Sequence, residues 1–184
     1  MTHIQFQAFT ARANGRLHRL ISEVEVFPPF PPNAPATQGR KYMALYDTGA
    51  THSAISPQVV QDLSLPSIGA RTVGVGGGFF PTTSHLVNIA LPNKVMITMA
   101  PVANIPIPSG EGVVIGMDIL GMGDFAVTHF GGKTVFSFCF PSRRCIDFVA
   151  EANEYNKTHL PAKNALCPCR SGKKYKSCCG RHRR

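Results

Sequence analysis

The sequence predicts a mainly β protein with short helices and a small cysteine-rich C-terminal tail. The chain has 184 residues, 43% of them hydrophobic, which suits one modest domain with an appendage. It contains 17 glycines and 15 prolines but no tryptophan, and this composition favours short strands and turns over long helices. Four of the six cysteines lie between Cys167 and Cys179, at a spacing typical of metal ligands rather than of a disulfide framework.

The N-terminal segment is predicted to form two strands and a loop. Polar and apolar residues alternate over Ile4–Thr10 and Leu17–Phe27. We expect these strands to pair as a hairpin, because Asn14-Gly15 suits a type I′ turn. The proline-rich run 27–39 cannot pair as a central strand, so it is expected to be a loop with polyproline II character.

The middle of the chain alternates strands with one short helix. A strand is predicted at Tyr42–Tyr46, followed by a helix that Ser56 caps and Pro57 begins. A pair of strands flanks the glycine-rich stretch 73–84, and further strands are expected within Leu86–Met99.

Residues 112–156 are predicted to contain a strand, a hairpin and two helices. Residues 112–120 indicate a buried strand that runs into a short helix near Asp118. Phe125–Phe140 is expected to form a hairpin around Gly131-Gly132, and Asp147–Asn156 is expected to be helical.

The net charge of +9 is concentrated in the tail. Seven of the 19 basic residues lie there, and the remaining 12 nearly balance the 10 acidic ones. The N-terminus lacks a basic start followed by an apolar core, and the most apolar stretch is short, so we expect neither a secretory signal nor membrane insertion. A cytoplasmic location is therefore predicted. The basic tail residues are Arg170, Lys173, Lys174, Lys176, Arg181, Arg183 and Arg184.

The motif Asp47-Thr48-Gly49 follows the apolar strand Tyr42–Tyr46. A carboxylate at such a turn can take part in acid–base chemistry when a second carboxylate shares its proton. Ala50 cannot donate a hydrogen bond to such a pair, so the pair is expected to stay singly protonated closer to neutral pH. Thr51 and Ser53 are other hydroxyls that could donate instead.

Residues 42–140 resemble the retropepsins, the single-domain aspartic proteases of retroviruses and their cellular relatives. The resemblance rests on the order of Asp47-Thr48-Gly49, the glycine-rich run Gly74–Gly78 and Val114-Ile115-Gly116. It implies a single-lobe closed β-barrel or sandwich over residues 1–148, acting on polypeptides. Asp47 would be the catalytic acid and base, supported by Thr48 and Gly49, and the substrate-binding flap would comprise Gly74, Val75, Gly76, Gly77 and Gly78.

The sequence has no second Asp-Thr-Gly motif and no internal repeat. The second carboxylate is therefore expected from Asp47 of another copy of the chain, across a two-fold axis. The predicted enzyme is a homodimeric aspartic endopeptidase. The alternative is a non-catalytic dimer of the same fold that acts as a peptide-, ribosome- or RNA-binding adaptor.

The tail, residues 164–184, resembles the zinc-binding SEC-C motif of the preprotein translocase motor. The resemblance implies a structural Zn²⁺ held by Cys167, Cys169, Cys178 and Cys179, with His182 as an alternative to Cys179. Arg170 stands where glycine is commonest in that family. Residues 149–163 would be a helical linker, and the basic tail could bind the ribosome, the secretion machinery or RNA.

Simpler interpretations apply to several residues outside these motifs. His52 is interpreted as a surface or satisfied strand residue, and Asp118 as a charge at a helix N-terminus. Cys139 and Cys145 lie outside the cysteine cluster and are expected to be buried thiols. Taken alone, Asp47-Thr48-Gly49 would be an ordinary β-turn and the glycine run a linker.

Overall fold

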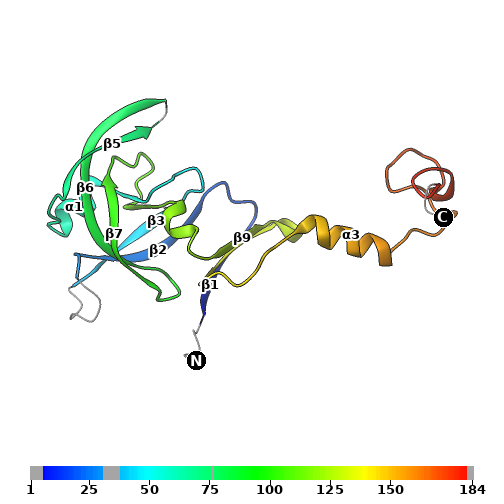
Figure 1. Ribbon diagram of the computed structural model, residues 1–184, viewed down its shortest axis with the longest axis horizontal. Coiled ribbons are helices and arrows are strands. Elements are labelled where there is room, and N and C mark those ends of the chain that lie inside the picture. Colours follow the sequence, from blue (N-terminus) through cyan, green and yellow to red (C-terminus); the bar gives the residue numbers. More distant parts are fainter. Residues whose placement is uncertain (1–5, 31–37, 76, 182–184) are drawn as a thin grey trace. The chain divides into compact units, whose positions relative to one another are not determined.

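The computed structural model describes residues 6–30, 38–75 and 77–181 (Figure 1). The chain divides into two compact units, Met1–Arg143 and Arg144–Arg184. Within the described residues, unit 1 contains ten strands and only short helices, which confirms the predicted mainly β class.

The strands are β1 (Gln7–Asn14), β2 (Leu20–Phe27), β3 (Arg40–Tyr46), β4 (Ala54–Ile55), β5 (Gly69–Val75), β6 (Gly78–Ala90), β7 (Met96–Asn104), β8 (Val113–Ile115), β9 (Asp124–Thr128) and β10 (Lys133–Phe140). The helices are α1 (Pro57–Asp62), α2 (Met117–Leu120) and α3 (Phe148–Thr158), with 3₁₀ turns η1 (Phe130–Gly132) and η2 (Tyr175–Ser177).

Seven strands form one sheet in the order β2-β3-β8-β4-β7-β6-β5. An additional pairing of β2 with β6 closes six of these strands into a barrel and leaves β5 outside the closed ring. Closure removes exposed strand edges, which would otherwise be open to pairing with other chains. The barrel is filled by aliphatic side chains that are fully buried: Val26, Ile55, Val59, Val87, Ile89, Val102, Val113 and Ile115.

The predicted hairpin at Asn14-Gly15 is wrong. β1 pairs with β10 along its whole length, in a separate three-stranded sheet of order β1-β10-β9, and does not pair with β2. The gain from this long-range pairing is aromatic packing, because Phe9 lies 5.6 Å from Phe136 and 6.1 Å from Phe138 between ring centroids. Local turn chemistry is overridden by these contacts.

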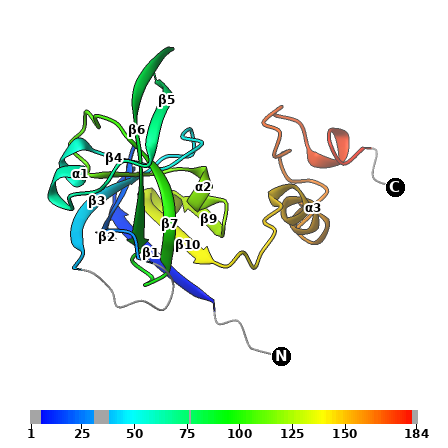
Figure 2. The ribbon, with the colours of Figure 1, turned by 60° about the vertical axis from the view of Figure 1, so that its left-hand side comes forward.

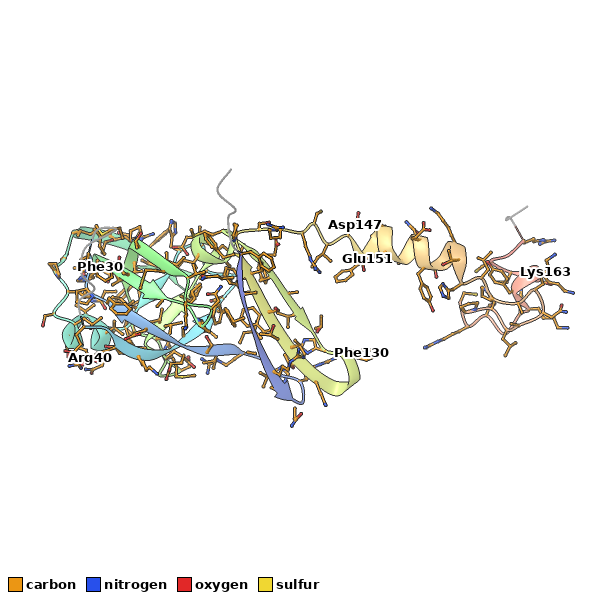
Figure 3. The ribbon with its side chains drawn as sticks, turned by 90° about the horizontal axis from the view of Figure 1, so that it is seen from below. Phe30, Arg40, Phe130, Asp147, Glu151 and Lys163 are labelled. Carbon is orange, nitrogen blue, oxygen red and sulfur yellow. The ribbon has the colours of Figure 1, made fainter. Side chains whose placement is uncertain are left out.

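Several other predicted elements are confirmed with small changes. The hairpin after Phe125 consists of β9 and β10, joined at η1, and Figure 3 marks Phe130 at this turn. Ser56 occupies the N-cap of α1, but its side chain makes no capping hydrogen bond; its carbonyl accepts from Val59 and Val60 instead. Most of the predicted proline-rich loop lies outside the described residues.

Unit 2 contains α3 and the cysteine-rich segment. Asp147 caps α3 with its side chain, accepting hydrogen bonds from the backbone N–H groups of Val149 and Ala150, as predicted for a helix starting here (Figure 3).

The expectation that Cys139 and Cys145 are buried thiols is wrong for Cys145, which is exposed, while Cys139 is half-buried. Cys145 lies in the irregular segment that precedes α3.

Candidate active site and metal centre

Asp47 lies directly after β3, at the point where this strand runs parallel to β8. Its backbone N–H donates to the carbonyl of Ile115 at 3.0 Å, which continues the ladder between the two strands. Its carboxylate oxygen Oδ1 accepts a hydrogen bond from the Gly49 N–H at 2.8 Å. The half-buried carboxylate is therefore held by its own turn at the end of a barrel strand.

Gly116 allows the segment after β8 to cross close to the loop that follows Asp47. A Cβ atom at this position would lie 2.6 Å from the His52 carbonyl carbon and 2.8 Å from the Ala50 oxygen. Next to this crossing, the Met117 N–H donates to the Ala50 carbonyl at 2.8 Å. The glycine in Val114-Ile115-Gly116 is thus required by the approach of two backbones.

Ser53 and Asp118 fix the same crossing through side chains. The Asp118 carboxylate accepts from the Ser53 N–H at 2.9 Å and from the Ser53 hydroxyl at 2.7 Å. The Ser53 oxygen in turn accepts from the Gly116 N–H at 3.0 Å. The Ser53 hydroxyl is therefore committed to this network, and it donates to Asp118 rather than to Asp47.

Sequence reasoning missed this role of Asp118, which was interpreted only as a charge at a helix N-terminus. Asp118 does lie in the first turn of α2, but its partner Ser53 is 65 residues earlier in the chain. No local pattern connects the two residues. His52 is exposed, which agrees with its interpretation as a surface residue.

A pocket of about 500 Å³ opens beside Asp47. One wall is the loop after Asp47, a second is β5, and apolar residues from β4, β7 and β8 form the rest. Asp47 is the one acidic residue among the described residues that line it. The lining comprises Asp47, Gly49, Ala50, Thr51, His52, Ser53, Ala54, Arg71, Thr72, Val73, Gly74, Ala103, Ile105 and Val114.

The predicted site residues are distributed unevenly around this pocket. Asp47, Gly49 and Gly74 line it, whereas Thr48 is exposed and is not part of its lining. The glycine run forms the turn of the β5–β6 hairpin, in which Val75 pairs with Gly78 and Gly77 has a left-handed φ of +86°. Gly76 lies outside the described residues. Figure 2 shows this hairpin projecting beyond the other strands of unit 1.

The four predicted metal ligands of the tail lie together. The sulfur atoms of Cys167, Cys169, Cys178 and Cys179 are all within 4.8 Å of one another. Individual separations are 3.3 Å from Cys169 to Cys167 and 3.5 Å from Cys169 to Cys178. A tetrahedral zinc site with Zn–S bonds of about 2.3 Å has sulfur atoms about 3.8 Å apart, so the geometry is compatible with a metal site.

The thiols of the cluster differ in acidity. The Ser171 hydroxyl, followed by the Cys167 thiol, lowers the pKa of Cys169 to about 6. Contacts with Cys167, then Cys169 and Cys178, raise the pKa of Cys179 to about 12. Four neighbouring thiolates repel one another, and a bound cation would offset that repulsion.

Arg170 adopts a left-handed backbone with φ of +61° within the loop between the two cysteine pairs. Its N–H donates to the carbonyl of Cys167 at 3.1 Å. A positive φ favours glycine, which explains why glycine suits this position in the SEC-C motif.

Comparison with known proteins agrees with both resemblances. Residues 36–119 match the aspartyl protease family. This segment contains Asp47, the β5–β6 hairpin and the crossing at Gly116, so it includes the site described above. Residues 164–181 match the SEC-C motif. The predicted resemblance to aspartic proteases is confirmed by the first match, which supports a protease-type function, and the resemblance to SEC-C is confirmed by the second.

Two individual proteins are similar to parts of the chain. A "UPF0225 protein" from Serratia proteamaculans (strain 568) is 76% identical over 21 residues, which cover 11% of this chain and 14% of that protein. The crystal structure of a retropepsin-like aspartic protease from Rickettsia conorii has 13% sequence identity and a TM-score of 0.44, covering 73% of this chain and 96% of that chain.

Over residues 6–30, 38–75 and 77–181, no helix is both long enough and apolar enough to cross a membrane.

Proposed function

We propose that the chain is a homodimeric aspartic endopeptidase with Asp47 as its catalytic residue. The observation that carries this proposal is the position of Asp47, whose carboxylate borders a pocket of about 500 Å³ between its own loop and the β5–β6 hairpin. A pocket between a carboxylate and a projecting hairpin can hold an extended peptide, whose backbone would pair with strand edges. The glycine-rich turn of residues 74–78 would serve as the flap.

Peptide hydrolysis by this site would need two Asp47 carboxylates that share one proton. The ionised carboxylate accepts a proton from a water molecule while the water oxygen attacks the peptide carbonyl carbon, and the protonated carboxylate donates its proton to the carbonyl oxygen. When the C–N bond breaks, the leaving nitrogen takes the proton from one carboxylic acid, and a hydroxyl of the tetrahedral diol returns its proton to the other carboxylate, so the pair is again singly protonated. No covalent intermediate with the protein forms.

The second carboxylate is best supplied by a second chain. Asp118 is hydrogen-bonded to Ser53 at the edge of the site, but its oxygens accept three hydrogen bonds, two from Ser53 and one from the Ile119 N–H. It is therefore committed to the crossing of the two loops, and it does not line the pocket. Thr48 is exposed beside Asp47 and is free to contact the Thr48 loop of the partner.

The test is digestion of a denatured-protein library by the purified chain, followed by mass spectrometry of the products. Asp47→Asn should abolish cleavage because an amide cannot hold the shared proton or the charge. Asp147→Asn is the matched control, since asparagine also caps helices well and α3 should remain intact. Undiminished cleavage by the Asp47→Asn protein would refute the aspartic mechanism.

For the tail we propose a structural zinc site in residues 164–184, held by Cys167, Cys169, Cys178 and Cys179. Four sulfur ligands around one ion would complete a closed tetrahedral shell and would leave no position for a reacting water. Residues 1–148 would be the protease domain and 149–163 a helical linker. Free thiols at these positions suit the reducing cytoplasm, which we propose as the location.

The tail would dock a partner or substrate. Its basic side chains Arg170, Lys173, Lys174 and Lys176 are all exposed. Such a surface suits RNA, the ribosome or acidic surfaces of the secretion machinery. The same feature favours the second candidate function, a non-catalytic adaptor. Retained binding by the Asp47→Asn protein, without cleavage by the native protein, would favour the adaptor.

A further inference from the structure

Arg71 faces the Asp47 pocket from β5, the outer strand of the projecting hairpin. Along β5 the half-buried residues are Arg71 and Val73, while Thr72 and Gly74 are exposed. Val73 packs against the buried cluster Ala54, Ala103 and Val114, all of which line the pocket. Because alternate residues of a strand share a face, Arg71 is on the same inner face as Val73.

The guanidinium of Arg71 makes no hydrogen bond or ion pair with any other described residue. It is also the one permanent cation among the described residues that line the pocket, where Asp47 and His52 are the other ionisable groups. A half-buried arginine without a protein partner retains its full capacity to bind a ligand carboxylate through two parallel hydrogen bonds.

We infer that Arg71 is a specificity-determining residue that selects substrates with an acidic side chain close to the scissile bond. This inference rests on the proposed peptidase function. The pair of Asp47 carboxylates carries a net negative charge, which disfavours an acidic side chain in an adjacent subsite unless a cation offsets it. Arg71 supplies that cation, and its planar fork matches the geometry of a glutamate or aspartate side chain.

The proposed dimer would present two Arg71 side chains to one bound peptide. Each chain of the dimer contributes one Arg71, so a peptide bound across both halves meets an arginine on each side of its scissile bond. Preferred cleavage sites should therefore carry acidic residues at positions on both sides of the cut. A single specificity pocket in a monomeric enzyme would select on one side only.

The competing role for Arg71 is to act on Asp47 rather than on substrate. In that case Arg71→Gln would shift the pH–rate profile for every peptide equally and would leave the choice between acidic and neutral side chains unchanged. The two roles are therefore separated by comparing peptide pairs that differ only in charge.

The experiment first maps cleavage sites of the native protein in a denatured-protein library. Peptides made from the best sites, with glutamate, glutamine or lysine at the enriched positions, are then assayed with native protein, Arg71→Gln and Arg71→Glu. Arg16→Gln is the control, because Arg16 is an exposed loop residue outside the pocket.

Native protein should hydrolyse the glutamate peptide with a kcat/KM about tenfold higher than the glutamine peptide, as expected for a charge-assisted hydrogen bond. Arg71→Gln should reduce this ratio to about one, Arg71→Glu should favour lysine at the same position, and Arg16→Gln should behave as native. A ratio near one in the native protein, or an unchanged ratio in Arg71→Gln, would overturn the inference while leaving Asp47-dependent cleavage intact. Cleavage that survives Asp47→Asn would instead refute the proposed function and the inference with it.

Discussion

Substitution of Ser53 by alanine should destabilise unit 1, because the one oxygen atom that is removed takes part in two hydrogen bonds. Ser53 is fully buried, and its hydroxyl donates to Asp118 while accepting from the Gly116 N–H. Alanine removes both hydrogen bonds and leaves the buried Gly116 N–H without an acceptor. The loop that carries Asp47 would then be linked to the Asp118 side chain only through the backbone N–H of residue 53.

The magnitude follows from these two losses. An unsatisfied buried N–H costs about 1–3 kcal/mol. The bond to Asp118 is worth about 1 kcal/mol, because Asp118 is itself exposed and solvent weakens its charge. The total is about 3 kcal/mol, a large part of the roughly 5–15 kcal/mol that stabilises a typical domain. At about 3 °C per kcal/mol for a domain of this size, the Tm should fall by roughly 10 °C.

The assay is thermal denaturation of the native and variant proteins followed by circular dichroism. All samples should have the same concentration, because the proposed dimer would make Tm concentration-dependent. Ser84→Ala is the matched control: Ser84 is half-buried, and its hydroxyl makes no hydrogen bond with another described residue. Its Tm should change by no more than about 2 °C. The reasoning about the loop crossing fails if Ser53→Ala melts within 2 °C of the native protein.

Two further predictions concern the metal and the dimer. The purified protein should contain about one zinc ion per chain by elemental analysis, and the Cys169→Ser variant should lose this zinc. Peptidase activity that vanished with a chelator and returned with zinc would contradict a purely structural site. Activity per chain should fall on dilution through the dimer dissociation constant, and excess Asp47→Asn chains should inhibit native chains by forming heterodimers. Full activity from a species that light scattering shows to be monomeric would exclude the two-chain site.

The elements that could be predicted from the sequence are those specified by neighbouring residues. The strand before Asp47, the β5–β6 hairpin and the helix after Asp147 each carry their own pattern of apolar spacing, glycine or capping residues. The pairing of β1 with β10 could not be predicted, because it joins residues at opposite ends of unit 1. Asn14-Gly15 is a valid turn signal, but it does not determine which strand becomes the partner.

The site shows the same division between local and long-range information. Asp47-Thr48-Gly49 and the four cysteines are short motifs, and the identity and spacing of their residues indicate their chemistry. The four sulfur atoms do lie within 4.8 Å of one another. Arg71 was not predicted as part of this chemistry, and Ser53 was predicted only as a possible donor to the Asp47 pair, whereas it donates to Asp118. Their importance depends on which residues the barrel brings opposite them, and a single sequence contains no direct sign of that.

The crossing at Gly116 explains why the two motifs together indicate the fold better than either motif alone. Asp47-Thr48-Gly49 alone is compatible with any tight turn, and Val114-Ile115-Gly116 alone is compatible with any buried strand. In the fold the two segments run parallel, with the Asp47 N–H bonded to the Ile115 carbonyl and with no room for a side chain at Gly116. Each motif therefore imposes a steric or hydrogen-bonding requirement on the other. Because the two requirements are met about 70 residues apart in one chain, a chance occurrence of both is far less probable than a chance occurrence of either.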